Sequence, residues 1–151
     1  MSHDIKQLKP TKYGRYEQGY INNAACKKLF PSLRNQPIIF RSSYERKLVS
    51  WFESNKDVKY WGSECVKIPY MYIDKCMHTY YPDYFVEMTD GSYIMIEVKP
   101  KSQTVKPKED DNWAYNTYIK NICKWKAAKK YCEDRNIKFQ ILTENTINKL
   151  C

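Results

Sequence analysis

The stretch from residue 84 to residue 98 constrains the fold most, because apolar residues alternate along two short segments that a turn sequence joins. The two segments, Tyr84–Met88 and Tyr93–Val98, are rich in aromatic and β-branched residues, which favour strands. The Thr-Asp-Gly sequence between them is typical of a tight hairpin turn. This stretch therefore predicts an antiparallel β-hairpin.

The loop length of this hairpin decides which side chains share a face of the sheet. A two-residue loop would place Asp83 opposite Val98, on the apolar face. A three-residue loop from Thr89 to Gly91 would instead place Asp83 opposite Glu97 and bring the aliphatic residues of both strands together. Burial favours the three-residue loop, with Gly91 at positive φ in a bulge.

In this register Asp83 and Glu97 lie side by side, and Lys99 shares the face of Glu97. We expect the opposite, apolar face of the strands to be the core side. Two neighbouring carboxylates repel each other, and a hard divalent cation such as Mg²⁺ would relieve that repulsion. Such an ion would polarise a phosphodiester and activate water, while Lys99 would hold that water or stabilise the developing charge. The alternative is a surface trio that forms a weak cross-strand ion pair.

The remaining pattern predicts two helices and two more strands. Residues 43 to 55 place apolar side chains on one helical face, and residues 113 to 135 form a longer helix with a basic side. Residues 66 to 71 are expected to form a strand at an edge, which Pro69 tolerates, and residues 139 to 143 form a last strand. The order helix, strand, strand, strand, helix, strand implies an α/β fold with a small mixed β-sheet flanked by helices.

Glu45 is a third candidate carboxylate, near the start of the first predicted helix. Ser42 followed by Glu45 matches a capping box, which makes Ser42 the expected N-cap. A helix that precedes the sheet would also aim Glu45 at the ion held by Asp83 and Glu97. The residues leave both roles open, and the two roles are compatible only if the helix begins beside the site.

Positive charge dominates the chain. The net charge is +9, the isoelectric point is about 9.2, and residues 1 to 41 carry six of the nine net charges. A basic surface attracts polyanions, of which nucleic acid is the commonest, so the charge favours a nucleic acid or nucleotide partner over a basic surface that only aids solubility. We divide the chain into a basic N-terminal arm over residues 1–35 and a globular domain over residues 36–151. The cations expected to contact DNA are Lys9, Lys12, Arg15, Arg41, Lys101, Lys124 and Lys126.

The cysteines and the hydropathy pattern indicate a cytoplasmic location. Six cysteines without a CxxC pair, together with two histidines, do not make a zinc site, and we expect mostly reduced thiols. Reduced thiols fit the cytosol. The sequence contains no apolar run of roughly 18 residues and no signal-peptide pattern, so we expect no membrane span.

The motif Pro82-Asp83 followed by Glu97-Val98-Lys99 resembles the PD-(D/E)xK nuclease superfamily, whose members have a restriction-endonuclease-like fold. Residues 40 to 45 resemble the helix start in the endonuclease subunit of bacterial cut-and-paste transposons. That likeness continues through residues 81 to 85, 90 to 91, 96 to 100 and 139 to 144. Chain size, the basic arm and composition are most similar to the head-completion nucleases of T4-like bacteriophages.

The resemblance implies a Mg²⁺-dependent deoxyribonuclease, with Mn²⁺ as a substitute ion. Carried over by position, Asp83, Glu97 and Glu45 hold the metal and Lys99 is the catalytic lysine. The resemblance also implies action on packaged DNA in head completion and head–tail joining, in the host cytoplasm or the virion, with phage head or neck proteins as partners. The alternative is a non-catalytic DNA-binding or virion-assembly module that keeps the fold, and the motif alone leaves RNA cleavage open.

Overall fold

A computed structural model describes residues 19–21, 25–108 and 110–150 of the chain. Its centre is a four-stranded sheet in the order β3-β6-β7-β8. The four strands are β3 (Val58–Ser63), β6 (Tyr84–Met88), β7 (Tyr93–Val98) and β8 (Lys138–Leu142). Strand β6 is antiparallel to both β3 and β7, whereas β8 is parallel to β7. The mixed sheet that the sequence predicts is therefore confirmed.

The central hairpin has the predicted register. Tyr84 pairs with Ile96 and Val86 pairs with Ile94, so extending the ladder by one step places Asp83 opposite Glu97. The Met88 N–H donates to the Ser92 carbonyl at 2.8 Å, which closes a loop of three residues. Gly91 has a φ of +87°, the left-handed conformation that favours glycine. The three-residue loop and the positive φ at Gly91 are thus confirmed.

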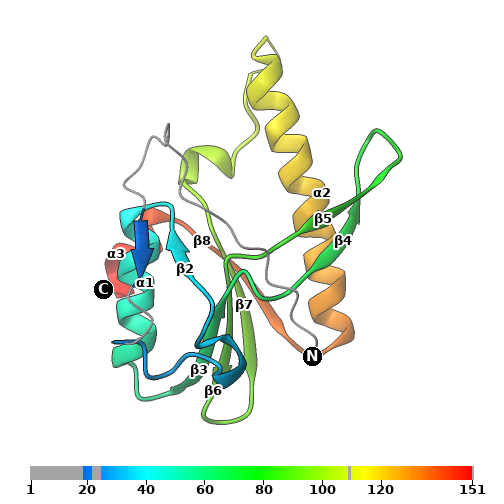
Figure 1. Cartoon of the computed structure of the whole chain (residues 1–151). Coiled ribbons are helices and arrows are strands. Elements are labelled where there is room, and N and C mark those ends of the chain that lie inside the picture. Colours follow the sequence, from blue (N-terminus) through cyan, green and yellow to red (C-terminus); the bar gives the residue numbers. More distant parts are fainter. Residues whose placement is uncertain (1–18, 22–24, 109, 151) are drawn as a thin grey trace.

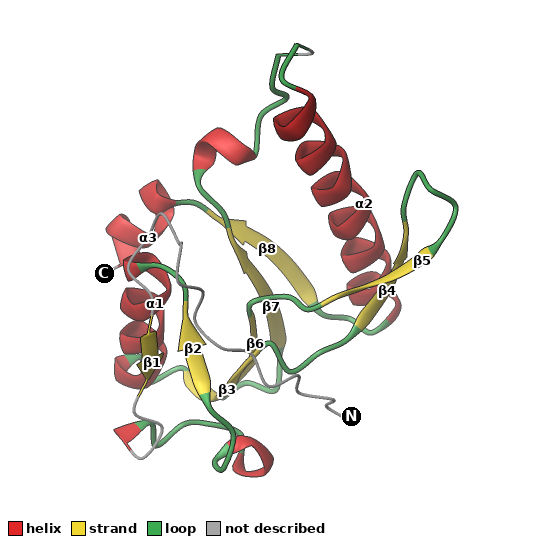
Figure 2. Cartoon of the chain, turned by 45° about the horizontal axis from the view of Figure 1, so that its top comes forward, coloured by secondary structure: helices red, strands yellow, loops and turns green. Residues whose placement is uncertain are grey.

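Helices cover both faces of the sheet (Figures 1 and 2). The helices are α1 (Ser43–Ser54), α2 (Asn112–Asp134) and α3 (Glu144–Leu150), with short 3-10 turns η2 (Pro31–Leu33) and η3 (Lys101–Gln103). The α1 helix packs with α3 on one side, and α2 lies on the other side. Helix α2 links β7 to β8, and such a crossover is what a parallel strand pair requires.

The sheet has two core faces, where the sequence predicted one. Tyr84, Val86 and Ile96 point into the core beneath α1, as expected. Phe85 and Met95, on the face of Asp83 and Glu97, are equally buried in a second core beneath α2. The expectation of a single core face was wrong because β6 and β7 are nearly continuous apolar runs, which is the pattern of strands that are buried on both sides.

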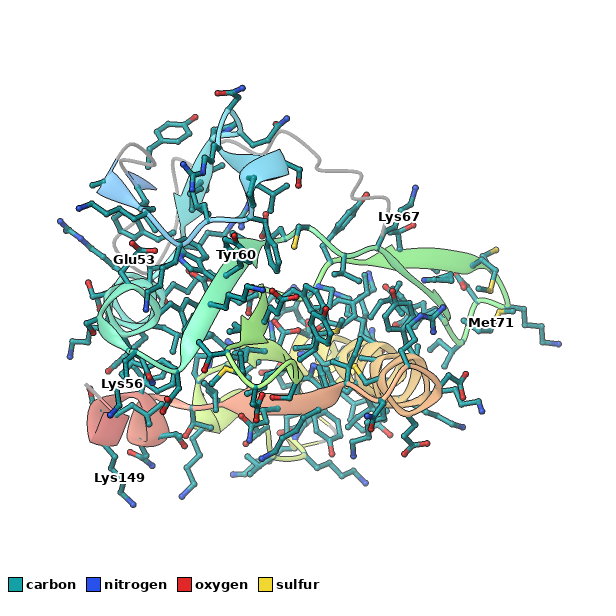
Figure 3. The ribbon with its side chains drawn as sticks, turned by 90° about the horizontal axis from the view of Figure 1, so that it is seen from below. Glu53, Lys56, Tyr60, Lys67, Met71 and Lys149 are labelled. Carbon is teal, nitrogen blue, oxygen red and sulfur yellow. The ribbon has the colours of Figure 1, made fainter. Side chains whose placement is uncertain are left out.

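Two small sheets flank this body. Strands β1 (Gly19–Ile21) and β2 (Ile38–Phe40) pair with each other, as do β4 (Ile68–Met71) and β5 (Met77–Tyr80). The β4–β5 ribbon packs beside α2, and Figure 3 shows Met71 far out along it. Pro69 lies in this two-stranded ribbon, an edge position of the kind expected. The sequence pattern missed β1, β2, β3, β5 and α3.

The described part of the predicted N-terminal arm belongs to the folded domain. Strand β1 pairs with β2, and Leu29 and Leu33 are buried in the two cores. Glu53 of α1, labelled in Figure 3, accepts hydrogen bonds from the backbone N–H groups of Lys27 at 2.7 Å and Lys28 at 3.0 Å. Residues 1–18, with most of the predicted basic arm, lie outside the described residues. Within the described residues, none of the helices is long and apolar enough to cross a bilayer.

Candidate active site

Asp83 and Glu97 meet at the end of the central hairpin where β6 begins and β7 finishes. Buried Pro82 precedes Asp83, and Glu97 is only 5% exposed. The Val98 N–H donates to Asp83 Oδ2 at 2.6 Å, which fixes the Asp83 carboxylate against the neighbouring strand. The Tyr80 hydroxyl, from the end of β5, donates to Glu97 Oε2. Each carboxylate therefore has a donor that orients it.

The surroundings of Asp83 favour the protonated form of its carboxyl group. Burial raises the pKa of Asp83 well above its usual range, and the charge of Glu97 raises it further. The charge of Glu45 also raises the pKa of Asp83, whereas the hydrogen bond from the Val98 N–H lowers it. Burial, followed by the charge of Glu97, likewise raises the pKa of Tyr80. The tyrosine therefore stays a neutral donor.

Glu45 lies in the first turn of α1 and lines the same cavity as Asp83 and Glu97, so both of the roles that the sequence left open stay available to it. Ser42 is the N-cap of α1, and its Oγ accepts from the Glu45 N–H at 3.3 Å. In a capping box the glutamate side chain accepts from the backbone N–H of the N-cap residue. Here the Glu45 carboxylate instead accepts from the N–H of Arg41, the residue before the N-cap, at 2.5 Å. Burial raises the pKa of Glu45, which is 8% exposed, and the charge of Glu64 adds to that rise. The helix begins beside the site, so capping and a site role are compatible.

Glu64 is a further carboxylate that the sequence analysis missed. It follows β3 in the left-handed region, with a φ of 48°, and its N–H donates to the Asp83 carbonyl at 2.9 Å. Its carboxylate forms an ion pair with the Arg41 guanidinium at 2.6 Å. Burial raises the pKa of Glu64, and the charge of Glu97 contributes to that rise. Nothing in the sequence around Glu64 signals this position, because a turn between two sheets brings it there.

Two lysines also lie near the carboxylate pair. The Lys99 N–H donates to the Leu142 carbonyl at 3.0 Å, so pairing with β8 fixes the backbone of Lys99 at the site. Lys124 projects from α2, and its Nζ lies 5.7 Å from the centre of the Tyr80 ring. Burial lowers the pKa of Lys124, and so does the charge of Lys99, whereas Glu97 and Asp83 act in the opposite direction. Lys124 is thus close enough to both carboxylates to act on the same ligand.

The structure separates the other predicted DNA contacts. Arg41 lines the site, and Lys101 is exposed, with its N–H donating to Glu144 Oε2 at 2.9 Å. Lys126 is exposed two residues beyond Lys124, which places it on the other side of α2. The other three predicted contacts lie outside the described residues; they are Lys9, Lys12 and Arg15.

These side chains surround a cavity of about 220 Å³, which we call the carboxylate cleft. Its lining includes Arg41, Glu45, Asp83, Glu97, Lys99 and Gln103. A larger cavity of about 600 Å³ lies between β1 and α1. The carboxylate in its lining, Glu53, already accepts hydrogen bonds from Lys27, Lys28 and Trp61. The chemistry therefore points to the smaller cavity.

The donor set of the carboxylate cleft suits a hard divalent ion. Asp83 and Glu97 offer oxygen atoms, and their mutual repulsion is what a cation would relieve. Within the described residues, no three acidic, histidine or cysteine side chains are already grouped as a complete metal cage. Mg²⁺ usually takes one or two carboxylates and fills its other positions with water and phosphate, so a pair of carboxylates is enough to anchor it. We expect the Asp83–Glu97 pair to be the anchor and Glu45 to be the more distant member.

Comparison with known proteins identifies the family to which the chain is similar. The family described as "TnsA-like endonuclease N terminal" matches residues 55–144, a range that contains Asp83, Glu97 and Lys99. The head completion nuclease of Enterobacteria phage T4 is 36% identical over 125 residues, which cover 75% of this chain and 83% of that protein. Both comparisons support an enzyme that acts on DNA.

Proposed function

This chain belongs to the TnsA-like N-terminal endonuclease family, and we propose that it is a divalent-metal-dependent deoxyribonuclease that hydrolyses phosphodiester bonds in the carboxylate cleft. One observation carries the proposal. Asp83 and Glu97 lie side by side at the wall of one cavity, burial and the charge of Glu97 raise the pKa of Asp83, and Lys99 lines the same cavity. Two adjacent carboxylates repel each other and so do not stabilise the fold by themselves, whereas a cation bound in the cavity would relieve the repulsion.

We assign the metal to Asp83 and Glu97, with Glu45 as the third ligand, and Mg²⁺ as the ion, for which Mn²⁺ can substitute. All three side chains offer oxygen donors, which hard ions of this kind prefer. When bound, such an ion polarises a phosphodiester and lowers the pKa of a coordinated water.

The residues of the chain perform the remaining tasks. The Lys99 ammonium stabilises negative charge that develops on the phosphate oxygens, which is the usual role of a fixed cation at a phosphoryl centre. Lys124 supplies a second cation from α2 and holds the phosphate against the sheet. The Val98 N–H and the Tyr80 hydroxyl keep the two carboxylates in fixed orientations. Arg41 binds Glu64, and its backbone N–H binds Glu45, so it positions the third carboxylate.

The biological setting follows from the relative. The phage T4 protein is named a head completion nuclease, and this chain covers 83% of it. We propose that this chain acts on packaged DNA during phage head completion and head–tail joining, with head or neck proteins as partners, in the host cytoplasm or in the virion. The basic charge of the chain supports DNA as the substrate.

A plasmid cleavage assay tests the catalytic proposal. Supercoiled plasmid should be cut in the presence of Mg²⁺ and left intact in EDTA, and Asp83→Asn should abolish cutting. The matched control is Glu133→Gln, an exposed carboxylate on α2, which should behave as wild type. Calorimetric Mg²⁺ titration provides a second readout, because Asp83→Asn should also weaken metal binding. If the wild-type protein binds plasmid and never cuts it with Mg²⁺ or Mn²⁺, the chain is the non-catalytic DNA-binding module instead.

A further inference from the structure

A second cavity opens beside the carboxylate cleft, between the segment that follows η3 and the N-terminal half of α2. Its volume is about 80 Å³. Its lining includes Gln103, Val105, Trp113, Thr117, Tyr118 and Asn121. We call it the α2 pocket. Figure 1 shows that this half of α2, drawn in yellow, extends beyond the end of the sheet, so the pocket lies on a projecting part of the molecule.

The α2 pocket is contiguous with the carboxylate cleft. Gln103 lines both cavities. Asn121 precedes Lys124 by three residues on α2, which corresponds to a rise of about 4.5 Å along the helix axis. Lys124 in turn neighbours Glu97 and Asp83, so the pocket lies beside the carboxylate cleft along α2.

The pocket contains a buried donor that lacks an acceptor. The Asn121 side chain is 3% exposed, and its Nδ2 has no hydrogen-bond partner among the described residues. Buried amide donors are nearly always paired, and leaving one unpaired destabilises the protein. A ligand that presents an acceptor inside the pocket would satisfy Asn121.

The mouth of the pocket carries apolar side chains that face solvent. Trp113 is 77% exposed and Val105 is 55% exposed, although side chains of both types are usually more buried. An exposed indole beside a narrow apolar slot is suited to stack on a planar ring. A planar ring with polar atoms on its edge would contact both Trp113 and Asn121.

We propose that the α2 pocket receives one unpaired nucleobase of the DNA strand, next to the scissile phosphate. Trp113 stacks on the base, and the Asn121 amide donates to a carbonyl oxygen or ring nitrogen on its edge. This inference rests on the proposed DNA substrate and defines it more closely. A base in an intact duplex is stacked and paired, and reaches the pocket only after it has been turned out of the helix. The preferred substrate is therefore DNA that has an unpaired nucleotide at the cut.

Fluorescence anisotropy with three short DNA duplexes tests the proposal. They are identical except at one position, which holds a paired base, an unpaired base or an abasic sugar. Binding to full-length Asp83→Asn protein in Ca²⁺ should be about tenfold tighter for the unpaired base than for the abasic duplex, since stacking on one aromatic ring contributes a factor of roughly this size. Equal affinity for these two duplexes would show that the protein senses only DNA flexibility, and would overturn the proposal.

Variants locate the effect in the pocket. Trp113→Ala in the Asp83→Asn background should remove the preference for the unpaired base, while Ile122→Ala, an exposed residue of α2 outside the pocket lining, should keep it. Asn121→Leu should reduce the preference for the unpaired base as well. Asn121 is buried, so this variant can fail to fold, whereas replacing the exposed Trp113 leaves the core intact and tests the pocket by itself. A preference that survives Trp113→Ala would overturn the proposal. A wild-type protein that prefers the unpaired base but never cuts DNA would refute the catalytic function and leave this inference intact. A wild-type protein that cuts DNA but shows no preference for the unpaired base would refute this inference and leave the catalytic function intact.

Discussion

The two walls of the carboxylate cleft carry opposite charge, and they are built differently. The acidic wall, as we call it, is Glu45 in the lining of the cleft together with the neighbouring Glu64, and Arg41 binds both side chains. The basic wall is Lys99 in the lining of the cleft together with the neighbouring Lys124 of α2. The acidic wall is fixed by short hydrogen bonds, whereas Lys124 contacts the face of a tyrosine ring and keeps its ammonium available.

The comparison shows how the cleft separates two ligands of opposite charge. In the proposed function, the acidic wall and the Asp83–Glu97 pair attract the cation, and the basic wall attracts the phosphate. Rigid carboxylates suit a metal ion, which requires defined geometry, and flexible lysines suit a phosphate group, which they bind as point charges. Each wall can therefore be disabled separately.

Removing the charge of the carboxylate pair should have the largest effect. Asp83→Asn or Glu97→Gln should lower the cleavage rate by more than about 10²-fold, the loss that a displacement of about 1 Å at a reacting centre can cause. The folded state should not lose stability, because the wild-type pair is buried and mutually repulsive. Plasmid cleavage and thermal unfolding measure the two quantities. Either variant retaining Mg²⁺-dependent cleavage would disprove the metal assignment.

On the basic wall, Lys99→Met should lower turnover by about 10²- to 10³-fold, as removal of one preorganised charge-stabilising group does. DNA binding should persist, because many cations share the phosphate contacts. Single-turnover cleavage and filter binding distinguish the two effects, with Lys129→Met, an exposed lysine of α2, as the control. Equal losses of binding and cleavage would make Lys99 a DNA anchor rather than a catalyst.

Lys124→Met should act more weakly, through one phosphate contact. We expect the log–log slope of DNA affinity against salt to become shallower by up to about 0.9, the contribution of one neutralised phosphate. Lys126→Met reports on a lysine two residues away on the other side of α2, so comparing the two variants shows which side faces DNA. An unchanged salt slope in Lys124→Met would remove this lysine from the basic wall.

The acidic wall also predicts a pH dependence of stability. Because burial raises the folded-state pKa of Asp83, Glu45 and Glu64 above their unfolded values, their protonated forms favour the folded state. That contribution is complete below the unfolded values near about 4 and is lost as pH rises through the folded values. In EDTA, the melting temperature should therefore fall as the pH rises above about 4, with Mg²⁺ restoring part of the loss at high pH. A melting temperature that rises over this range in EDTA would contradict the raised pKa values.

The hairpin turn should give the smallest effect. A side chain at position 91 meets no atom within 4 Å, so Gly91→Val acts through its left-handed φ alone. The cost should be about 1–2 kcal/mol in the free energy of unfolding. Gly91→Asn is the matched control, because asparagine tolerates this conformation. Urea denaturation that gives equal stabilities for the two variants would show that the turn has relaxed to another conformation.

The central hairpin was predictable because its determinants are local. Alternation of apolar residues and one Thr-Asp-Gly turn specify the register, and the register alone places Asp83 beside Glu97. The Ser42 cap was predictable for the same reason, since both partners of the cap lie within four residues. Strand β3 was missed because its alternation is broken by a bulge and by Gly62.

The partners of the carboxylates were not predictable, because tertiary contacts bring them to the site. Tyr80 ends a strand whose other residues are mostly exposed, so nothing in its pattern signals burial. Glu64 reaches the cleft through a left-handed turn, and Lys124 through the packing of α2 on the sheet. Even the placement of Glu45 depended on where α1 begins relative to β7, which hydrophobic periodicity does not specify.

The parallel pairing of β7 with β8 has a consequence for how the protein is made. The backbone of Lys99 is fixed by the Leu142 carbonyl, which lies 43 positions later in the chain. During synthesis the ribosome releases the hairpin, with Asp83 and Glu97, well before it releases β8. Contacts of such long sequence separation form late in folding. The nascent chain therefore gains an ordered Lys99 only after strand β8 has emerged. Stopped-flow refolding should show two phases, an earlier one for hairpin formation and a later one for metal binding.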